Sequence, residues 1–309
     1  MALSAPLLSR KRVIQVKVDA TKGATNTVPD TDILVFDLKI DPEDSFVERK
    51  GSGKVFGHTS PGVLQGTRAG SCSFKTELRS TGAAALDAGL VILLQACGHK
   101  QAVQVYTPTS LHATQETITI AVYEDGLKKM LYGCSGTFTM APEDGRIVLS
   151  FDFKGVWVAP TDVALPTVAY SAVLPVSWGH GSNAFLLATL GIKISTFEFN
   201  AGCNVIPRMS NGLIDYYMIT DRDPTMTFDP ESDLVAGYAL HAAWLAGTEG
   251  AVSLALTDGT ATFTLAATKF QYREVKEGDR DGIMIDNVTG QFNIVTMNTG
   301  DDEYSLTVT

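Results

Sequence analysis

The amino-acid sequence predicts a mainly β protein of two tandem β-sandwich or barrel domains, each with one packing α-helix. Apolar and polar residues alternate along most of the chain. In Ile147–Lys154, for example, Ile147, Leu149, Phe151 and Phe153 share one face, and Ser150, Asp152 and Lys154 share the other. Only two segments have a helical pattern. The dipeptide Asp-Gly, which tolerates the positive φ of a tight hairpin turn, occurs four times.

The expected strands are short apolar or alternating runs that end near Gly, Pro, Asp or Asn. They are Arg12–Asp19, Asp32–Ile40, Ser71–Leu78, Glu116–Tyr123, Lys129–Met140, Arg146–Val158, Lys193–Phe199, Ile214–Thr220, Thr225–Asp229, Ala251–Leu256, Ala261–Tyr272, Asp281–Asp286 and Glu303–Val308.

The two expected helices are Leu86–Cys97 and Ser232–Leu245. Gly98 is placed to end the first, and Ser232 is placed to cap the start of the second. Each helix follows a strand and precedes two hairpins with Asp-Gly turns, so the order of elements occurs twice along the chain. We therefore expect one domain over residues 1–165 and a second over 166–309, joined within the proline-containing segment Pro160–Pro175. The segment His99–Gln115 of the first copy is expected to be a projecting loop or arm.

Composition limits the possible functions. The chain has 309 residues, 45% of them hydrophobic, which is enough for a large core. Lys and Arg total 24 against 34 Asp and Glu, a net charge of −10. A protein that grips nucleic acid needs a positive surface, so the charge fits either simple solubility or passage of DNA without binding. Leu86–Cys97 is too short for a membrane span, which needs about 20 apolar residues.

Local motifs for chemistry are weak. Gly179–Asn183 (GHGSN) and Glu277–Gly282 (EGDRDG) are interpreted as turns, because neither has the helical context of a phosphate or calcium loop. The five histidines form no zinc-type spacing, and the four cysteines contain no Cys-x-x-Cys pair. A hydrolase with two carboxylates stays formally open. We expect no enzyme activity, metal or cofactor.

Five segments carry a resemblance to a known family. They are Lys11–Thr21 (KRVIQVKVDAT), Asp37–Gly53 (DLKIDPEDSFVERKGSG), Cys72–Gly98 (CSFKTELRSTG to LLQACG), Ile219–Glu231 (ITDRDPTMTFDPE) and Gly300–Val308 (GDDEYSLTV). In this order they resemble the phage tail tube proteins, the major tail proteins of long-tailed bacteriophages. The chain departs from the family pattern at Ser80-Thr81-Gly82, where the family has a glycine-rich turn, and at Gln95, where it has Arg.

The resemblance implies a structural virion protein. Tail tube subunits form rings that stack into a tube, and genomic DNA leaves through the lumen without specific binding. A duplicated domain favours a homotrimer that acts as a pseudo-hexamer, although six chains per ring stays open. The implied partners are other copies of the chain and the tape measure, tail terminator and baseplate or tip proteins, with no membrane. The implied location is the virion tail, after assembly in the host cytoplasm.

Alternation along two strands yields candidate site residues. Those opposite the apolar face are expected to face the lumen: Ser73, Lys75, Glu77, Ser150, Asp152 and Lys154. Charges in the resembling segments are expected at the subunit interface: Arg79, Arg222 and Glu231. The alternative function is a carbohydrate- or receptor-binding β-sandwich of a virion tip. That function needs an aromatic-lined groove, whereas Trp157, Trp178 and Trp244 are dispersed in the sequence.

Overall fold

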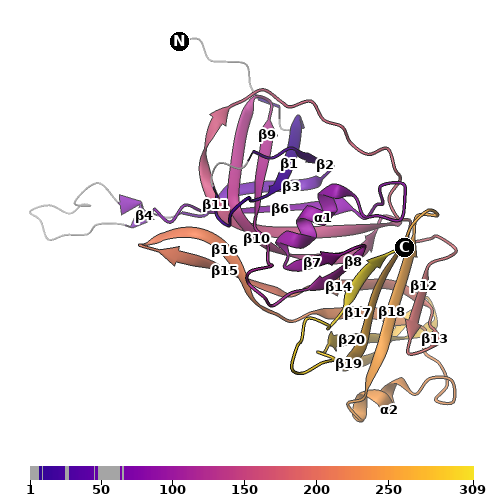
Figure 1. Cartoon of the computed structure of the whole chain (residues 1–309). Helices are drawn as coiled ribbons and strands as arrows, with labels where there is room; N and C mark the ends of the chain where they lie inside the picture. Colours follow the sequence, from indigo (N-terminus) through magenta and orange to yellow (C-terminus); the bar gives the residue numbers. More distant parts are fainter. Residues whose placement is uncertain (1–6, 9, 25–27, 45, 48–62, 65) are drawn as a thin grey trace, which may run out of the picture.

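The protein is mainly β, as the sequence predicts, with 57% of its residues in strands and 5% in helices. The structure is a computed structural model that describes residues 7–8, 10–24, 28–44, 46–47, 63–64 and 66–309. Figure 1 shows the first half of the chain above the second half, with the long hairpin of β15 (Cys203–Ser210) and β16 (Leu213–Arg222) and the strand β4 (Phe46–Val47) pointing to the same side.

The first half contains one helix and a large antiparallel sheet. Its elements are β1 (Arg12–Val18), β2 (Thr31–Ile33), β3 (Phe36–Pro42), β4 (Phe46–Val47), β5 (Val63–Leu64), β6 (Ala69–Glu77), α1 (Ala88–Ala96), β7 (His99–Ala102), β8 (Val105–Pro108), β9 (Ile118–Glu124), β10 (Leu127–Glu143) and β11 (Arg146–Asp162). The main strands pair antiparallel in the order β2-β1-β9-β10-β11-β6-β3.

The second half repeats this arrangement. Its elements are β12 (Ala184–Leu187), β13 (Leu190–Gly191), β14 (Ile194–Asn200), β15 (Cys203–Ser210), β16 (Leu213–Arg222), β17 (Thr225–Pro230), α2 (Leu240–Leu245), β18 (Glu249–Thr257), β19 (Thr262–Arg280), β20 (Ile283–Phe292) and β21 (Ser305–Val308). The pairing order β13-β12-β18-β19-β20-β17-β14 matches the first half strand for strand. The sequence repeat of strand, helix and two Asp-Gly hairpins therefore corresponds to a repeated pairing pattern.

The two halves join through shared strand edges. The first part of β10 pairs with β9 as far as Cys134, and β11 occupies the other edge along its whole length. Beyond Cys134, the edge of β10 that pairs with β9 pairs instead with β14 of the second half. Thr139 lies opposite Asn200 and Met140 opposite Phe199. The N–H of Ala201 adds a bond to the carbonyl of Phe138 at 3.0 Å. We call this junction of β10 and β14 the internal seam.

A second junction corrects one prediction. His99–Gln115 is not a projecting loop: its first part forms the hairpin β7–β8, and β8 pairs with the C-terminal strand β21 at Tyr106 opposite Leu306. His99 and Tyr106 are buried. The sequence shows no strong strand pattern here, and one of the two strands that pair with β8 comes from the other end of the chain.

The helices differ in how well they were predicted. α1 begins after Asp87, whose carboxylate accepts a bond from the N–H of Gly89 at 2.9 Å, and Gly98, which has a positive φ, follows its C-cap Cys97. Helix α2 starts at Leu240, so the expected cap at Ser232 is wrong. The N–H of Ser232 instead donates to the carbonyl of Met284, which keeps this segment attached to the sheet.

One apolar core runs through both halves. Rings from the first half, such as Phe138, contact rings from the second half, such as Phe199, at 5.8 Å between centroids. Phe199 in turn contacts Phe292 and Tyr304. The core therefore continues across the internal seam.

A close approach of backbone and ring in this core can be tested. A Cβ at Gly290 of β20 would collide with the ring of Phe270, which is 1% exposed. Gly290→Ala should lower the free energy of unfolding by about 2 kcal/mol, because overpacking forces the ring off its rotamer. Gly250→Ala is the matched control, since a Cβ there meets no atom within 4 Å. Chemical denaturation measures both variants, and equal stability would contradict the packing account.

Candidate functional site

The face of the sheet opposite the core is polar in the first half. Ser73 lies opposite Asp152 and Lys75 opposite Ser150 in the β6–β11 ladder. The alternate residues of the same strands, including Phe74 and Phe151, are buried in the core. Five of the six residues expected to face the lumen, namely Ser73, Lys75, Ser150, Asp152 and Lys154, are thus brought together on one accessible face. We call it the polar face.

The lysines of the polar face have acidic partners. Lys75 Nζ lies 2.8 and 2.9 Å from the two carboxylate oxygens of Glu143, and this hydrogen bond raises the pKa of Lys75. Lys154 Nζ lies 3.7 Å from a carboxylate oxygen of Glu43. Partial desolvation raises the pKa of Asp152, although Lys154 acts in the opposite direction. The pairings reduce the positive charge that this face can offer to phosphate groups.

Glu77 stands apart from the other five residues. It is buried at the end of β6, where its carboxylate lies 2.6 Å from Arg79 Nη2 and 2.7 Å from Arg146 Nη1. Arg79, which the sequence places at a subunit interface, is itself 6% exposed and has this partner within the chain. The guanidinium of Arg146 also stacks over the Phe36 ring at 4.9 Å from its centroid.

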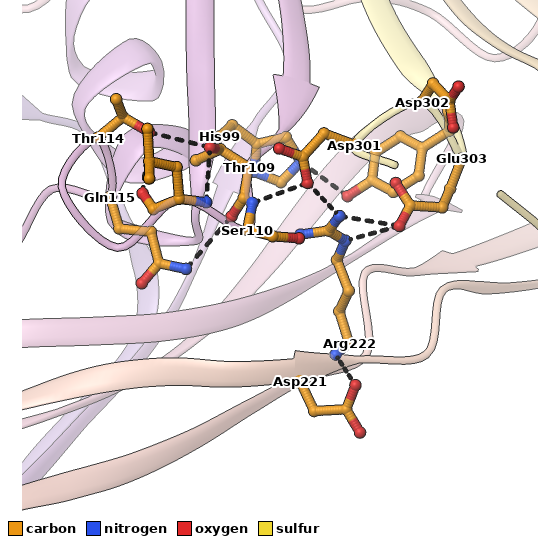
Figure 2. Close-up of polar contacts among 12 residues, drawn as sticks. His99, Thr109, Ser110, Thr114, Gln115, Asp221, Arg222, Asp301, Asp302 and Glu303 are labelled. Atoms are coloured by element: carbon orange, nitrogen blue, oxygen red, sulfur yellow. Dashed lines mark hydrogen bonds and ion pairs between the residues drawn. The ribbon is translucent and has the colours of Figure 1, made fainter. Parts of the chain in front are cut away.

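Arg222 is the centre of a second ion-pair cluster, at the base of the β15–β16 hairpin (Figure 2). Its Nη2 lies 2.8 Å from Asp301 Oδ1 and 2.8 Å from Glu303 Oε1, and its Nε lies 3.1 Å from the same Glu303 oxygen. The N–H of Ser110 donates to Asp301 at 2.7 Å. Desolvation alone would raise the pKa of Asp301, but the bonds from Ser110 and Arg222 outweigh it and lower that pKa.

His99 continues this cluster into the core. Its Nδ1 lies 3.1 Å from the carbonyl of Leu94 and its Nε2 lies 2.7 Å from the hydroxyl of Tyr304. A carbonyl can only accept, so Nδ1 carries the proton and Nε2 accepts from Tyr304. Burial lowers the pKa of His99 to about 4, so the ring is neutral near pH 7. His99 and Arg222 therefore attach the C-terminal segment to both halves of the chain.

Glu231 is the most exposed of the three expected interface charges. Its carboxylate lies 3.0 Å from Arg280 Nη2, and Asp229 lies 2.9 Å from Nη1 of the same guanidinium. The side chain of Glu231 keeps 36% of its surface exposed, against 12% for Arg222. All three expected interface charges thus have partners inside the chain.

The sequence pattern predicted only one strand of the hairpin β15–β16, namely the strand that became β16. Its turn, Asn211-Gly212, has positive φ at both residues, as a type I′ turn requires. Ile214 and Tyr217 pack with Val156 of β11 in a small second core, and Ser135 donates to the carbonyl of Tyr217 at 2.9 Å. The hairpin also exposes apolar residues, namely Ile206, Met209 and Leu213. The corresponding position of the first half carries β4 and β5, and residues 48–62 between them lie outside the described residues.

Sequence reasoning missed the cluster that joins the halves. His99, Ser110, Asp301 and Tyr304 share no local spacing that would bring them together, since 205 positions separate His99 from Tyr304. The one sequence signal for this cluster is the acidic run at Gly300–Glu303, which by itself indicates only the family resemblance.

Within the described ranges, no group of three or more His, Cys, Asp or Glu residues could hold a metal ion. Among the helices described, none is long and apolar enough to cross a membrane.

The chain thus contains a duplicated antiparallel sheet unit whose two copies are joined by shared strand edges. The family model for phage tail tube proteins matches residues 20–294 of the chain. The chain therefore belongs to the phage tail tube protein family and is a structural subunit of the virion tail, as the ordered motifs predicted. No curated protein matches its sequence closely enough to count as a relative.

The buried His99 makes a prediction about pH. Its folded pKa of about 4 lies below the ordinary 6.5, so between these values the unfolded chain binds the extra proton and stability falls as pH falls. From pH 7.5 to pH 5 the unmodified chain should lose about 2 kcal/mol more unfolding free energy than His99→Gln, which cannot titrate. Urea titrations at both pH values measure this difference. An identical loss in the two proteins would contradict the assignment.

Arg222 makes a prediction about stability. Arg222→Ala removes the cation that Asp301 and Glu303 share, and the chain should lose about 3 kcal/mol of unfolding free energy because buried Glu303 and half-buried Asp301 lose their partner. Arg222→Lys should lose less, since it keeps the charge but not the forked geometry. Arg273→Ala, at an exposed arginine of β19, is the matched control. If Arg222→Ala instead leaves stability unchanged and only blocks assembly, its role is at the subunit interface.

Proposed function

We propose that three copies of this chain close one ring of the tail tube, with the two halves of each chain in quasi-equivalent positions. The observation that carries the proposal is the duplicated pairing order, in which seven strands of each half are matched one to one. It also supports a division into two tail-tube-like domains at residues 1–165 and 166–309. No main-sheet strand lies between β11, which ends at Asp162, and β12, which begins at Ala184.

Ring closure needs a contact in which one surface of a unit fits a different surface of the next unit. The internal seam is a contact of that kind, because the β10 edge of the first half meets the β14 edge of the second half. A ring of six such units is complete with three chains, whereas six chains would be needed if each chain held one unit. The duplication therefore favours the trimer.

The lumen is proposed to be lined by polar faces of the β6–β11 type. The residues proposed to line the lumen are Ser73, Lys75, Glu77, Ser150, Asp152 and Lys154. Glu77 is buried, so its charge would act on the lumen from beneath the surface of the polar face. Lysines paired with carboxylates and a net charge of −10 give DNA few free cations to bind. Genomic DNA can then pass into the host without being held in the tube.

Other tail proteins complete the assembly. We propose that the tube contacts the tape measure, tail terminator and baseplate or tip proteins, and that it assembles in the host cytoplasm. Arg79, Arg222 and Glu231 remain proposed interface charges. Glu231 is the strongest of the three, because it keeps the largest exposed surface.

The ring can be tested directly. Purified protein at high concentration, viewed by negative-stain electron microscopy, should form rings or tubes, because unpaired sheet edges favour association. Mass photometry of single rings should give three chains of 33.0 kDa. A mass of six chains would refute the trimer while leaving the tube. A strict monomer that binds glycans would favour the virion-tip alternative instead.

A further inference from the structure

The two halves can be compared position by position through their ladders. In the first half, Thr139 of β10 lies opposite Ser150, five residues before the turn at Asp144-Gly145. In the second half, Lys276 of β19 lies opposite Asn287 at the same distance from Asp281-Gly282. Lys276 therefore corresponds to Thr139, and Glu277 to Met140.

The same comparison relates β3 to β14. In the first half, Ile40 lies opposite Cys72 and Asp41 opposite Ser71. In the second half, Phe199 lies opposite Met226 and Asn200 opposite Thr225. Since β6 and β17 occupy matching places in the two sheets, Asp41 corresponds to Asn200 and Ile40 to Phe199.

In each half, therefore, one strand edge lacks the partner strand that the equivalent edge of the other half has at the internal seam. The internal seam uses the β10 edge of the first half and the β14 edge of the second half. The matching edges are those of β19 beyond Gln271 and of β3. Within the described part of the chain, β19 from Arg273 to Arg280 pairs only with β20, and β3 pairs only with β6. Exposed edges of this kind are templates for pairing with another chain.

We propose that β19 of one chain pairs antiparallel with β3 of the next chain in the register of the internal seam. Lys276 then lies opposite Asp41 of the neighbouring copy, and Glu277 lies opposite its Ile40. The occupant of each free edge is a second copy of this chain. The inference rests on the proposed ring and specifies the contact that closes it.

Charge supports this register. The internal pair Thr139 and Asn200 is neutral, whereas its counterparts Lys276 and Asp41 are exposed and of opposite charge. Opposite charges directly across two strands are favourable, and a slip of one residue would place Lys276 beside Ile40 or Pro42 instead. Among the described residues, the one ion-pair partner of Lys276 is the exposed Glu274, two positions earlier in β19, and the two form a weak surface pair.

The seam between chains differs from the internal seam in two ways. At the internal seam, Ala201 donates its N–H to Phe138, but its counterpart is Pro42, which has no N–H to donate. On the core side, the buried pair Met140 and Phe199 is replaced by exposed Glu277 and buried Ile40. The contact between chains therefore has one backbone bond fewer and is more polar, as suits subunits that fold before they assemble.

Paired cysteines test the register. In a Cys203→Ser background, where the other three native cysteines are buried, Lys276→Cys with Asp41→Cys should form disulfides between chains in assembled rings. Thr139→Cys with Asn200→Cys should form the corresponding disulfide within one chain and is the positive control. Lys276→Cys with Lys39→Cys is shifted by two residues and should react at least about tenfold less, because diagonal neighbours are too far apart for a disulfide.

A charge exchange gives a second readout that needs no disulfide. Asp41→Lys should raise the concentration required for ring assembly by about tenfold, and adding Lys276→Asp should restore most of that loss. Rings that form normally but crosslink only in another register would overturn the proposed seam and leave the tube function intact. The absence of rings or tubes from the unmodified chain would overturn the tube function together with the seam.

Discussion

The edge of β10 is the constraint on which the rest of this structure depends. A strand of 17 residues exposes more backbone N–H and C=O groups than β9 can satisfy, and unpaired groups are costly when they are buried. The second half supplies the missing partner through β14 at Thr139 and Met140. Because this partner comes from the second half of the chain, the two halves form one continuous hydrogen-bonded assembly with a shared aromatic core.

The polar cluster beside that seam has a separate role. Burying Arg222 with two carboxylates gains less than it costs unless the geometry satisfies all three groups, so such clusters contribute more to a defined arrangement than to net stability. His99 adds a neutral link between α1 and the C-terminal segment. His99 holds the C-terminal segment against the first half, where β21 pairs with β8, and Arg222 holds the same segment against β16 of the second half. The relative position of the two halves is thereby specified by hydrogen bonds of defined direction as well as by apolar packing.

Residue patterns predicted the regular parts of the fold well. The Asp-Gly turns at Asp125, Asp144 and Asp281 adopt the positive φ that the dipeptide favours. Alternation along β11 separates buried Phe151 and Phe153 from the polar face, and Gly98 follows the end of α1 as expected. The errors lie where partners are distant. The hairpin β7–β8 needs β21 for its partner, the first turn of the expected second helix is held to β20 by Ser232, and β15 contains a proline within an exposed strand.

Residue patterns were sufficient to predict the fold class, the repeat and the family, because these depend on local alternation, turn chemistry and the order of motifs along the chain. The strand edges that meet and the partners of the charged side chains became clear from the three-dimensional arrangement alone. Glu77 shows the difference: alternation puts it on the polar face with Ser73 and Lys75, yet two arginines bury it. Arg222 has a suitable charge for a subunit interface but lies against Asp301 and Glu303, about 80 residues away. Strand periodicity specifies a face, whereas ion pairing depends on three-dimensional proximity that no local pattern contains.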